Sequence, residues 1–349
     1  MIHVFDDDER QVTDAANYAM NHGSFAAVAI NINKALKKIG LYAEPDDAEW
    51  VGTCASLGTH FKYKNKKNFI IHVWEATSMP VFVYNNGLTQ NRLFGLSNQI
   101  TKQWIKYGRK DVTTVYGGCD TEFWHQTRDK NPKQFQFCHV NSTNIRSGID
   151  LTVHAFALAF QGNRDVRLVV KDTNPQGEGS PLLAQINEHI KRFNVDIVYH
   201  SKRESMLWLR DLYSESHATL NLLRATSFGM PLLDCSACNS LCVTGDIEPT
   251  NELVRPHYGL LLEPKGLVKL WDIIPPLEQH WGLLNCYGRF PHLEDPYISD
   301  FDVNKYAQLL QEVWKQWPIY ATIDKRGPIV RDWSWDKSAQ RLKEQLYGV

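Results

Sequence analysis

The sequence predicts an α/β protein with two successive doubly wound domains. The chain has 349 residues, which is more than one hydrophobic core usually serves, so two domains are expected. Hydrophobic residues make up 43% of the chain, a composition typical of folded globular proteins. Short apolar runs alternate with segments of helical periodicity, and this alternation indicates parallel βαβ units.

The first alternation occupies the N-terminal third of the chain. Apolar runs predict strands at 1–5, 68–74 and 112–118, the last of which ends in a glycine turn. Apolar residues at helical spacing predict helices at Ser24–Gly40 and Ser97–Gly108, each of which ends at a glycine.

The alternation restarts after Lys133 and is more regular there. Strands are predicted at 135–140, 166–172, 195–200, 218–223, 241–246 and 258–264. Helices are predicted between them at 150–160, 182–193, 205–216 and 231–239. The polar segment Trp124–Gln134 has no apolar periodicity, so we place the boundary there, with domains at 1–130 and 131–325. Ligands of doubly wound sheets bind beyond the carboxyl ends of the strands, so functional residues should directly follow strands.

Composition excludes several classes of protein. The formal net charge is −1, and no run of about 18 apolar residues that could span a membrane is present. The first ten residues lack the basic and apolar regions of a secretory signal. Seven cysteines at irregular spacing suit a reducing compartment. We therefore expect a cytoplasmic protein without an integral membrane segment.

Two short motifs suggest metal binding, and each has another interpretation. Cys235, Cys238 and Cys242 are metal ligands or small buried thiols. The acidic run Asp6–Asp8 is a carboxylate cluster of a kind that can bind metal or, more commonly, a solvated loop. We expect no metal site.

The stretch Arg224–Ser240 combines an arginine, a flexible turn and an acid directly after a predicted strand. Gly229 allows a sharp reversal, and Pro231 is suited to the first position of a helix. The N-terminus of that helix would form an anion site at the strand ends. Asp234 would lie in reach of ligand hydroxyl groups, or it would only stabilise its own helix.

The same stretch resembles the signature of retaining glycosyltransferases of family 4, which have the GT-B architecture. Their pattern E-G-F-G-x-P-x-x-E-A appears as T-S-F-G-M-P-L-L-D-C at Thr226–Cys235. Four further segments resemble the family in the right order: the glycine turn with Gly118, Asp120 and Phe123, and the segments at 146–172, 248–264 and 331–346. The resemblance implies two facing Rossmann-like domains and a C-terminal helix, within 326–349, that crosses back to the N-terminal domain. GT-B glycosyltransferases of some bacteriophages add sugars to hydroxymethylated pyrimidines in DNA, and such a substrate would suit a compact chain that concentrates positive charge in its acceptor domain.

The resemblance also implies a reaction and a donor site. It implies transfer of a sugar from a nucleotide-diphosphate sugar, such as UDP-glucose, with retention at the anomeric carbon and without a required cofactor. Asp234 would bind the ribose, and Thr226, Ser227, Phe228 and Gly229 would contact the sugar and phosphate. Thr226 replaces the first glutamate of the signature.

The cations that hold the diphosphate differ from the family pattern. Ser142 and Ser147 lie where the family has Arg and Lys. A departing diphosphate develops negative charge, so a cation is required. Arg146, Lys171 and Arg224 are the candidates, and each could instead be a solvated surface cation.

The N-terminal domain should contribute the acceptor side of the site. Gly23 and Ser24 match a family loop that faces the donor phosphate, although Ser24 would serve equally as a helix cap. Glu75 follows a strand and could orient an acceptor hydroxyl or act as a base. His72 is expected to be a core histidine.

Charge suggests an anionic acceptor. Between His60 and Lys110 the sequence has nine basic residues and one acidic residue, Glu75. We expect Lys62, Lys64, Lys66 and Lys67 to contact the acceptor, unless they form a solvated basic face. A hydroxymethylated pyrimidine in duplex DNA and a saccharide are comparable candidates. The alternatives to a transferase are a non-catalytic nucleotide-sugar-binding module and a nucleotide-sugar epimerase of the same fold. The sequence does not indicate an oligomeric state.

Overall fold

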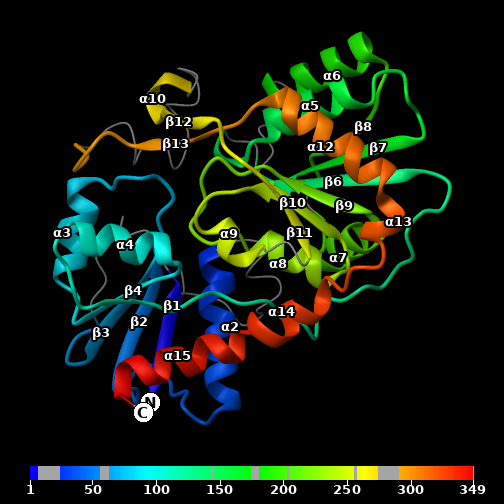
Figure 1. Ribbon diagram of the computed structural model, residues 1–349. Coiled ribbons are helices and arrows are strands. Elements are labelled where there is room, and N and C mark those ends of the chain that lie inside the picture. The colour runs from blue at the N-terminus through cyan, green and yellow to red at the C-terminus, as the bar shows by residue number, and fades with distance from the viewer. Residues whose placement is uncertain are drawn as a thin grey trace. The chain divides into compact units, whose positions relative to one another are not determined.

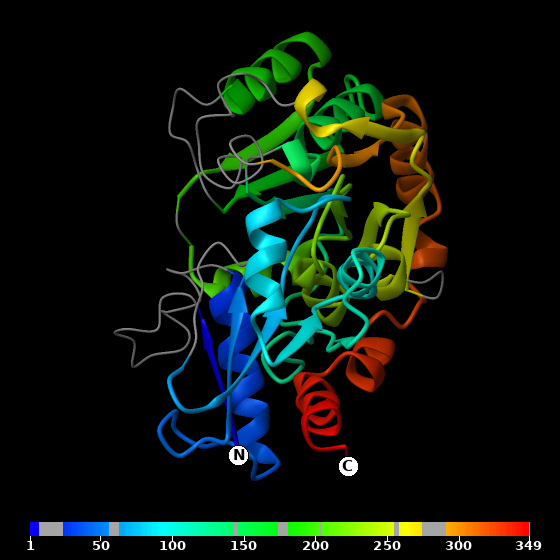
Figure 2. The same ribbon diagram turned by 90° about the vertical axis from the view of Figure 1, so that its left-hand side faces the viewer.

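The computed structural model describes residues 1–6, 24–55, 63–142, 145–173, 181–202, 204–254, 258–273 and 291–348. The chain forms two compact units, which are drawn in Figures 1 and 2. The first unit comprises Met1–Asp120, Ile274–Tyr297 and Asp332–Val349, and the second comprises Thr121–Ile273 and Ile298–Arg331. The chain therefore leaves the first unit twice and returns to it twice.

The first unit contains a sheet of five parallel strands. Their order in the sheet follows the chain: β1 (Ile2–Asp6), β2 (Trp50–Ala55), β3 (Lys67–His72), β4 (Arg92–Gly95) and β5 (Val112–Thr114). Tyr42 pairs in parallel with Ile2. Because β2 occupies one edge of β1, this bridge extends the sheet at the other edge. The chain thus winds first to one side of β1 and then to the other, as in a doubly wound sheet.

Four helices accompany this sheet: α2 (Ser24–Lys38), α3 (Val81–Leu88), α4 (Asn98–Lys106) and the C-terminal α15 (Trp335–Tyr347). Helix α15 packs against α2. The amide of Cys119 donates to the carbonyl of Trp333 (2.7 Å), and the N-terminal ammonium donates to the hydroxyl of Tyr347 (2.6 Å). The expected return of the C-terminal helix to the N-terminal domain is confirmed (Figure 1).

The second unit contains a sheet of six parallel strands. In chain order they are β6 (Phe135–Asn141), β7 (Val166–Asp172), β8 (Asp196–His200), β9 (Ala218–Asn221), β10 (Leu241–Gly245) and β11 (Gly259–Leu262), and each overlaps a strand expected from the sequence. Their order in the sheet is β11-β10-β9-β6-β7-β8. The winding therefore reverses between β6 and β9, which gives the Rossmann strand order. The predicted α/β class with two such domains is confirmed.

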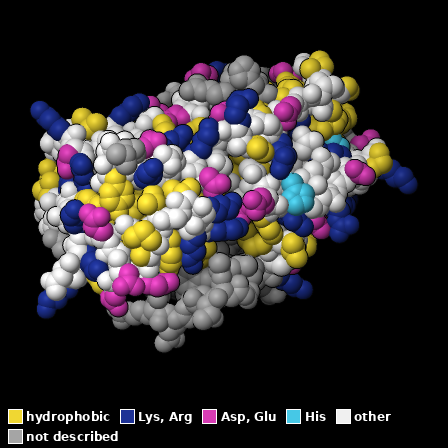
Figure 3. All heavy atoms as spheres, turned by 90° about the horizontal axis from the view of Figure 1, so that it is seen from below, with side chains coloured by type: hydrophobic (Ala, Val, Ile, Leu, Met, Phe, Trp, Pro, Cys, Tyr) yellow, Lys and Arg dark blue, Asp and Glu magenta, His cyan; other side chains and the backbone are white. Residues whose placement is uncertain are grey.

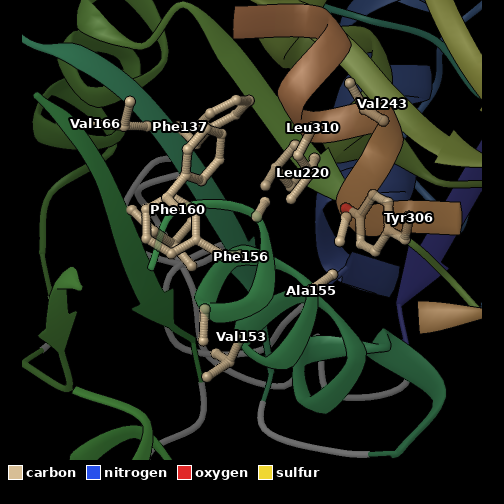
Figure 4. Close-up of a cluster of buried hydrophobic side chains, with 14 of the residues drawn as sticks. Phe137, Val153, Ala155, Phe156, Phe160, Val166, Leu220, Val243, Tyr306 and Leu310 are labelled. Atoms are coloured by element: carbon tan, nitrogen blue, oxygen red, sulfur yellow. The ribbon is translucent and has the colours of Figure 1, made fainter. Parts of the chain in front are cut away.

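Alternate side chains of β6 face two different helical layers. Phe137 packs with Val153 and Phe156 of α5 (Ile149–Ala159), with Phe160 directly after that helix and with α12 (Val303–Lys315), and Figure 4 shows this cluster. Helix α6 (Pro181–Phe193) joins the same layer. The next residue of β6, Cys138, turns to the opposite face, since strand side chains alternate. Helices α7 (Met206–Glu215) and α8 (Met230–Ala237) contact the sheet there.

Several elements have no counterpart in the sequence-based assignment. Besides β2, α3, β4 and α12, they are the 3-10 turn at Ile145–Ser147 and α9 (Thr250–Leu253), β12 (Gly266–Lys269), α10 (Leu270–Ile273), β13 (Tyr297–Asp300) and α13 (Trp317–Tyr320). Helix α14 (Arg326–Asp332) lies within the range 326–349, where the sequence predicts the C-terminal helix. Strands β12 and β13 form a separate two-stranded sheet. No helix in the described ranges is long and apolar enough to cross a membrane.

The cysteines after β9 are buried thiols in the layer between α8 and the sheet. Cys235, Cys238 and Cys242 have no exposed surface. Burial raises the pKa of the Cys238 and Cys242 thiols. No cluster of three or more His, Cys, Asp or Glu side chains that could bind a metal occurs among the residues that the structure describes. The interpretation as small buried thiols is the one that the structure favours.

Helix α5 begins at a glycine that no other residue could replace without rearrangement. Gly148 has φ +65°, a left-handed conformation that side chains disfavour. A Cβ atom there would lie 1.9 Å from the carbonyl oxygen of Leu222, just after β9. The close approach of α5 to β9 therefore depends on the missing side chain.

We predict that Gly148→Ala destabilises the protein more than Gly162→Ala does. Gly162 has a similar φ of +71°, but a Cβ atom added there would have no neighbour within 4 Å. The Gly162→Ala substitution should therefore lower the free energy of unfolding only by the backbone strain, which is about 1–2 kcal/mol. The clash at Gly148 should add roughly 1–3 kcal/mol. Urea unfolding of both variants measures the difference, and equal losses would contradict the role assigned to the Leu222 contact.

His217 is a buried neutral histidine at the amino end of β9. Its side chain is 6% exposed, and its ring stacks on Phe135 with centroids 4.2 Å apart. The amide of Gln136 donates to Nδ1 (3.1 Å), so this nitrogen carries no proton. Burial, with the charge of Lys130 next, lowers the pKa of His217 from 6.5 to about 4.

Acidification from pH 6.5 to 4 should therefore reduce stability through His217. In this window the unfolded chain binds the proton and the folded protein does not, so stability is present above pH 6.5 and is lost toward pH 4. His217→Asn keeps an acceptor for Gln136 but does not titrate. We expect the free energies of unfolding of wild type and variant to converge by roughly 2–3 kcal/mol between pH 7 and pH 4. Curves that run parallel in this range would rule out the mechanism, and His125→Asn is the control.

Candidate functional site in the second unit

The candidate site lies where the winding of the second sheet reverses. Strands β6 and β9 are neighbours there, and their carboxyl ends are followed by the described segments 145–148 and 222–229. In sheets of this kind ligands bind at this position, because the two connections diverge to opposite sides. The sequence placed Arg146, Arg224, Thr226 and Gly229 in these two segments, and the structure brings the segments together.

Two helices begin at this edge of the sheet. Helix α5 starts after Gly148, and α8 starts after Gly229, which has φ +99°. Pro231 lies in the first turn of α8, as the sequence predicts. The first amides of a helix lack intrahelical acceptors and carry partial positive charge, so each start favours an anionic group.

Arg224 ties the two segments together. Its Nη1 and Nη2 atoms donate to Oδ1 and Oδ2 of Asp150, each over 2.7 Å, and Nη1 also donates to the carbonyl of Ile145 over 2.7 Å. The amide of Arg224 donates to the carbonyl of Arg146 over 2.9 Å. The side chain of Arg224 is 6% exposed. It therefore faces protein groups, which differs from the expected contact with a donor phosphate.

Lys171 is also engaged within the protein. Its Nζ donates to the carbonyls of Asp172 and Lys202, each over 2.7 Å. The side chain is buried, and desolvation lowers its pKa. Lys171 therefore joins the end of β7 to the segment after β8. Of the three cations proposed for the diphosphate, Arg146 is the most exposed: it lies half-buried on the 3-10 turn before α5.

The residues after β9 present polar side chains beside the start of α8. Thr226 and Ser227 are half-buried, and Phe228 is buried. Asp234 is half-buried in α8, and the first turn of that helix contains no acidic residue. Since the effect of the helix dipole fades beyond the first turn, Asp234 is poorly placed to act only as a helix stabiliser.

The residues expected from the first unit are described only in part. Gly23, Lys62, Asp7 and Asp8 lie outside the described residues, and the side chains of Asp6 and Ser24 do too. Glu75 is half-buried after β3, and its carbonyl accepts from Gln99 Nε2 (3.3 Å). His72 is fully buried and its Nδ1 accepts from Trp104 Nε1 (3.0 Å), so the expectation of a core histidine is confirmed.

The lysines proposed for the acceptor lie at the amino edge of the first sheet. Lys67 begins β3, and its Nζ pairs with Glu49 (2.7 Å) and lies over the ring of Trp50. Lys66 donates to the carbonyl of Asp46 (2.5 Å), and Lys64 is exposed. Ligands are expected at the carboxyl edge instead.

Other basic residues counted in the sequence have acidic partners as well. Lys106 pairs with Glu294 (2.5 Å), and Arg109 is buried against Asp111. On the face shown in Figure 3, Lys and Arg side chains lie interspersed with Asp and Glu side chains. The positive charge of the segment between His60 and Lys110 is thus partly neutralised by acids from outside it.

Sequence reasoning overlooked Asp150 as a member of the site. It lies in the first turn of α5, and its carboxylate accepts hydrogen bonds from both terminal amino groups of Arg224. Asp150 and Arg224 are far apart in sequence, so no local spacing links them. Their positions could have indicated the pair, because Asp150 follows β6 and Arg224 follows β9, the two strands at the reversal.

Comparison with known families places this site in a recognised domain. Residues 120–271 match the family described as "Glycosyl transferases group 1". This range contains β6 to β11 and every candidate residue of the second unit. No curated protein matches the chain by sequence.

Solved structures share the fold over nearly the whole chain. Sucrose-phosphate synthase from Thermosynechococcus elongatus is similar with a TM-score of 0.61 and 14% identity, over 91% of this chain and 77% of that one. HepE from Anabaena, solved with UDP and glucose, gives 0.61 and 11%, over 100% of both chains. The pneumococcal O-GlcNAc transferase GtfA, solved with UDP and GlcNAc, gives 0.60 and 12%, over 92% of this chain and 60% of that one.

At such low identities the similarity establishes the fold alone. Together with the family match, it shows that the chain has the GT-B fold and contains a glycosyl transferases group 1 domain at residues 120–271.

Proposed function

We propose that the protein is a glycosyltransferase that takes a sugar from a nucleotide-diphosphate sugar and passes it to an acceptor hydroxyl group with retention of anomeric configuration. The observation that carries the proposal is the meeting of two helix starts, α5 and α8, at the strand reversal of the group 1 domain. A diphosphate is the group that such a pair of helix starts suits best.

The donor would lie along the segment from Thr226 to Asp234. The Asp234 carboxylate would accept hydrogen bonds from the ribose hydroxyl groups, which the backbone N–H groups of a helix start cannot do. Thr226, Ser227 and the amide of Gly229 would contact the sugar and phosphates. HepE and GtfA were both solved with UDP, which supports a uridine nucleotide as the first donor to test.

Transfer would proceed on one face of the sugar. The bond between the anomeric carbon and the β-phosphate oxygen breaks, the acceptor oxygen bonds to the same carbon, and its proton passes to the departing diphosphate. Arg146 would stabilise the charge that develops on the diphosphate. Glu75 would orient the acceptor hydroxyl. Thr226 donates a hydrogen bond but cannot offset positive charge as a glutamate would.

We propose a saccharide hydroxyl as the acceptor. The alternative, a hydroxymethylated pyrimidine in DNA, depends on unpaired positive charge in the first unit. The pairing of Lys67 and Lys106 with Glu49 and Glu294 weakens that argument.

The acceptor can be tested directly. Specific or non-specific binding to duplex DNA rests largely on phosphate contacts, which are strongest at low salt. We expect no measurable binding to duplexes that contain hydroxymethylcytosine or hydroxymethyluracil at about 50 mM salt, and no sugar transfer to them. Salt-sensitive binding that is lost when Lys64, Lys66 and Lys67 are changed to Glu would restore DNA as the acceptor.

Product stereochemistry tests the reaction. NMR of the anomeric proton should show the configuration of the donor, and an inverted linkage would refute the retaining mechanism. Tight binding of UDP-sugars, with neither transfer of the sugar nor slow hydrolysis of the donor, would favour a binding module. Formation of an epimer without any acceptor would favour an epimerase.

Asp234→Ala should weaken UDP binding without a matching loss of stability. A hydrogen bond to a charged group contributes roughly 1.5–3 kcal/mol, so the affinity should fall about 10- to 100-fold. Wild type should also bind 2′,3′-dideoxy-UDP more weakly than UDP, whereas Asp234→Ala should bind the two alike. Calorimetry measures both, with the exposed Glu215→Ala as the control. If Asp234→Ala only lowers the melting temperature, Asp234 is a structural acid.

A further inference from the structure

We infer that Arg224 and Asp150 are positioning residues: their ion pair holds the turn that carries Arg146 and the start of α5 in the geometry that receives the donor diphosphate. This inference rests on the proposed function. It assigns to Arg224 a role different from direct contact with the donor.

The pair joins three segments through one guanidinium group. Arg224 follows β9, Asp150 lies in the first turn of α5, and Ile145 begins the 3-10 turn between β6 and α5. Both carboxylate oxygens of Asp150 and the carbonyl of Ile145 accept from Arg224 at 2.7 Å. A two-bond arginine–carboxylate pair fixes orientation as well as distance, because both groups are planar.

The backbone of Arg224 extends the same junction. Its amide donates to the carbonyl of Arg146 (2.9 Å), and its carbonyl accepts from the amide of Ser299 (2.9 Å). Rotation of the turn at 145–147 would therefore break bonds to both the backbone and the side chain of Arg224. The direction in which Arg146 leaves this turn, and the direction of the first amides of α5, are set by the same contacts.

The charge of Arg224 is already compensated within the protein. Its side chain is 6% exposed, that of Asp150 is 30% exposed, and both terminal amino groups are used. The Nε atom of Arg224 is buried, so a diphosphate would be bound through the terminal amino groups. These groups would have to release Asp150 and leave a carboxylate beside an anionic ligand. Like charges so close together would oppose binding.

A second ion pair in the same unit provides a matched control. Arg167 Nε donates to Asp196 Oδ2 over 3.0 Å, between β7 and β8. Arg167 is the second residue of β7 and Asp196 is the first of β8, so this pair lies at the amino edge of the sheet. It is also an arginine–aspartate pair, although it is formed through one bond and Arg167 is more exposed than Arg224, and the candidate site is at the opposite edge.

The experiment compares Arg224→Lys, Asp150→Asn and the double variant with Arg167→Lys and Asp196→Asn in the full chain. Lys cannot form the two parallel bonds to Asp150 and also reach Ile145, and Asn lacks the second acceptor oxygen. Calorimetry with UDP measures affinity, and melting temperature measures stability. Amide hydrogen exchange without ligand measures the order of segments 145–150 and 222–226.

If the pair positions the site, Arg224→Lys and Asp150→Asn should each weaken UDP binding about tenfold or more, and the double variant should be no weaker than the worse single variant. Exchange should accelerate in both segments. The control variants should bind UDP as wild type does, whatever their melting temperatures.

Two results would overturn the inference. If Arg224→Lys weakens binding while Asp150→Asn preserves or strengthens it, Arg224 binds the diphosphate itself. If all four single variants lose stability but keep UDP affinity, the pair is only structural. If the wild-type protein binds neither UDP nor any other nucleoside diphosphate, the proposed function is refuted instead. In that case, amide hydrogen exchange of segments 145–150 and 222–226 that is unchanged in Arg224→Lys would also refute the positioning role.

Discussion

The junction between β6 and β9 depends on how closely two chain segments can approach. Gly148 lies so near Leu222 that a methyl group would not fit. Arg224 also joins the two segments, because it donates hydrogen bonds to Asp150 and to the carbonyl of Ile145. This arrangement places the starts of α5 and α8 at one edge of the sheet. The two helix starts that we propose bind the donor diphosphate are therefore held together by a packing constraint and an ion pair.

Several cations of the described residues are compensated by oxygen atoms of the protein itself. Arg224, Lys171 and Arg109 look like free cations in the sequence, yet each is buried and donates to carbonyl or carboxylate oxygens. Burying a charged group is favourable only when it is compensated in this way. A count of basic residues in a segment therefore overstates the field that a ligand would encounter, because the compensating groups come from elsewhere in the chain.

The regular second half of the chain was largely predictable from sequence. Buried parallel strands read as continuous apolar runs, and all six strands of the second sheet carry such runs. Strand β2 and helix α12 were missed. Trp50–Ala55 includes glycine, threonine and cysteine, which weakens its strand pattern. The apolar residues of Val303–Lys315 recur at helical spacing after the N-cap Asp302, so α12 has a sequence signal that was overlooked. Both elements are stabilised by neighbours that are distant in sequence: β2 lies between β1 and β3, and α12 packs on α5.

The sequence by itself determined the fold class and pointed to the segment Thr226–Asp234, because apolar periodicity and turn residues act over a few neighbours. Only the tertiary structure decided where the winding of the sheet reverses and that Arg224 and Lys171 are engaged within the protein. Arg224 and Asp150 are separated by the length of several elements, and they meet because the winding of the sheet reverses between β6 and β9. The partner of a buried charge is set by this long-range arrangement, since an ion pair in a desolvated site requires direct contact.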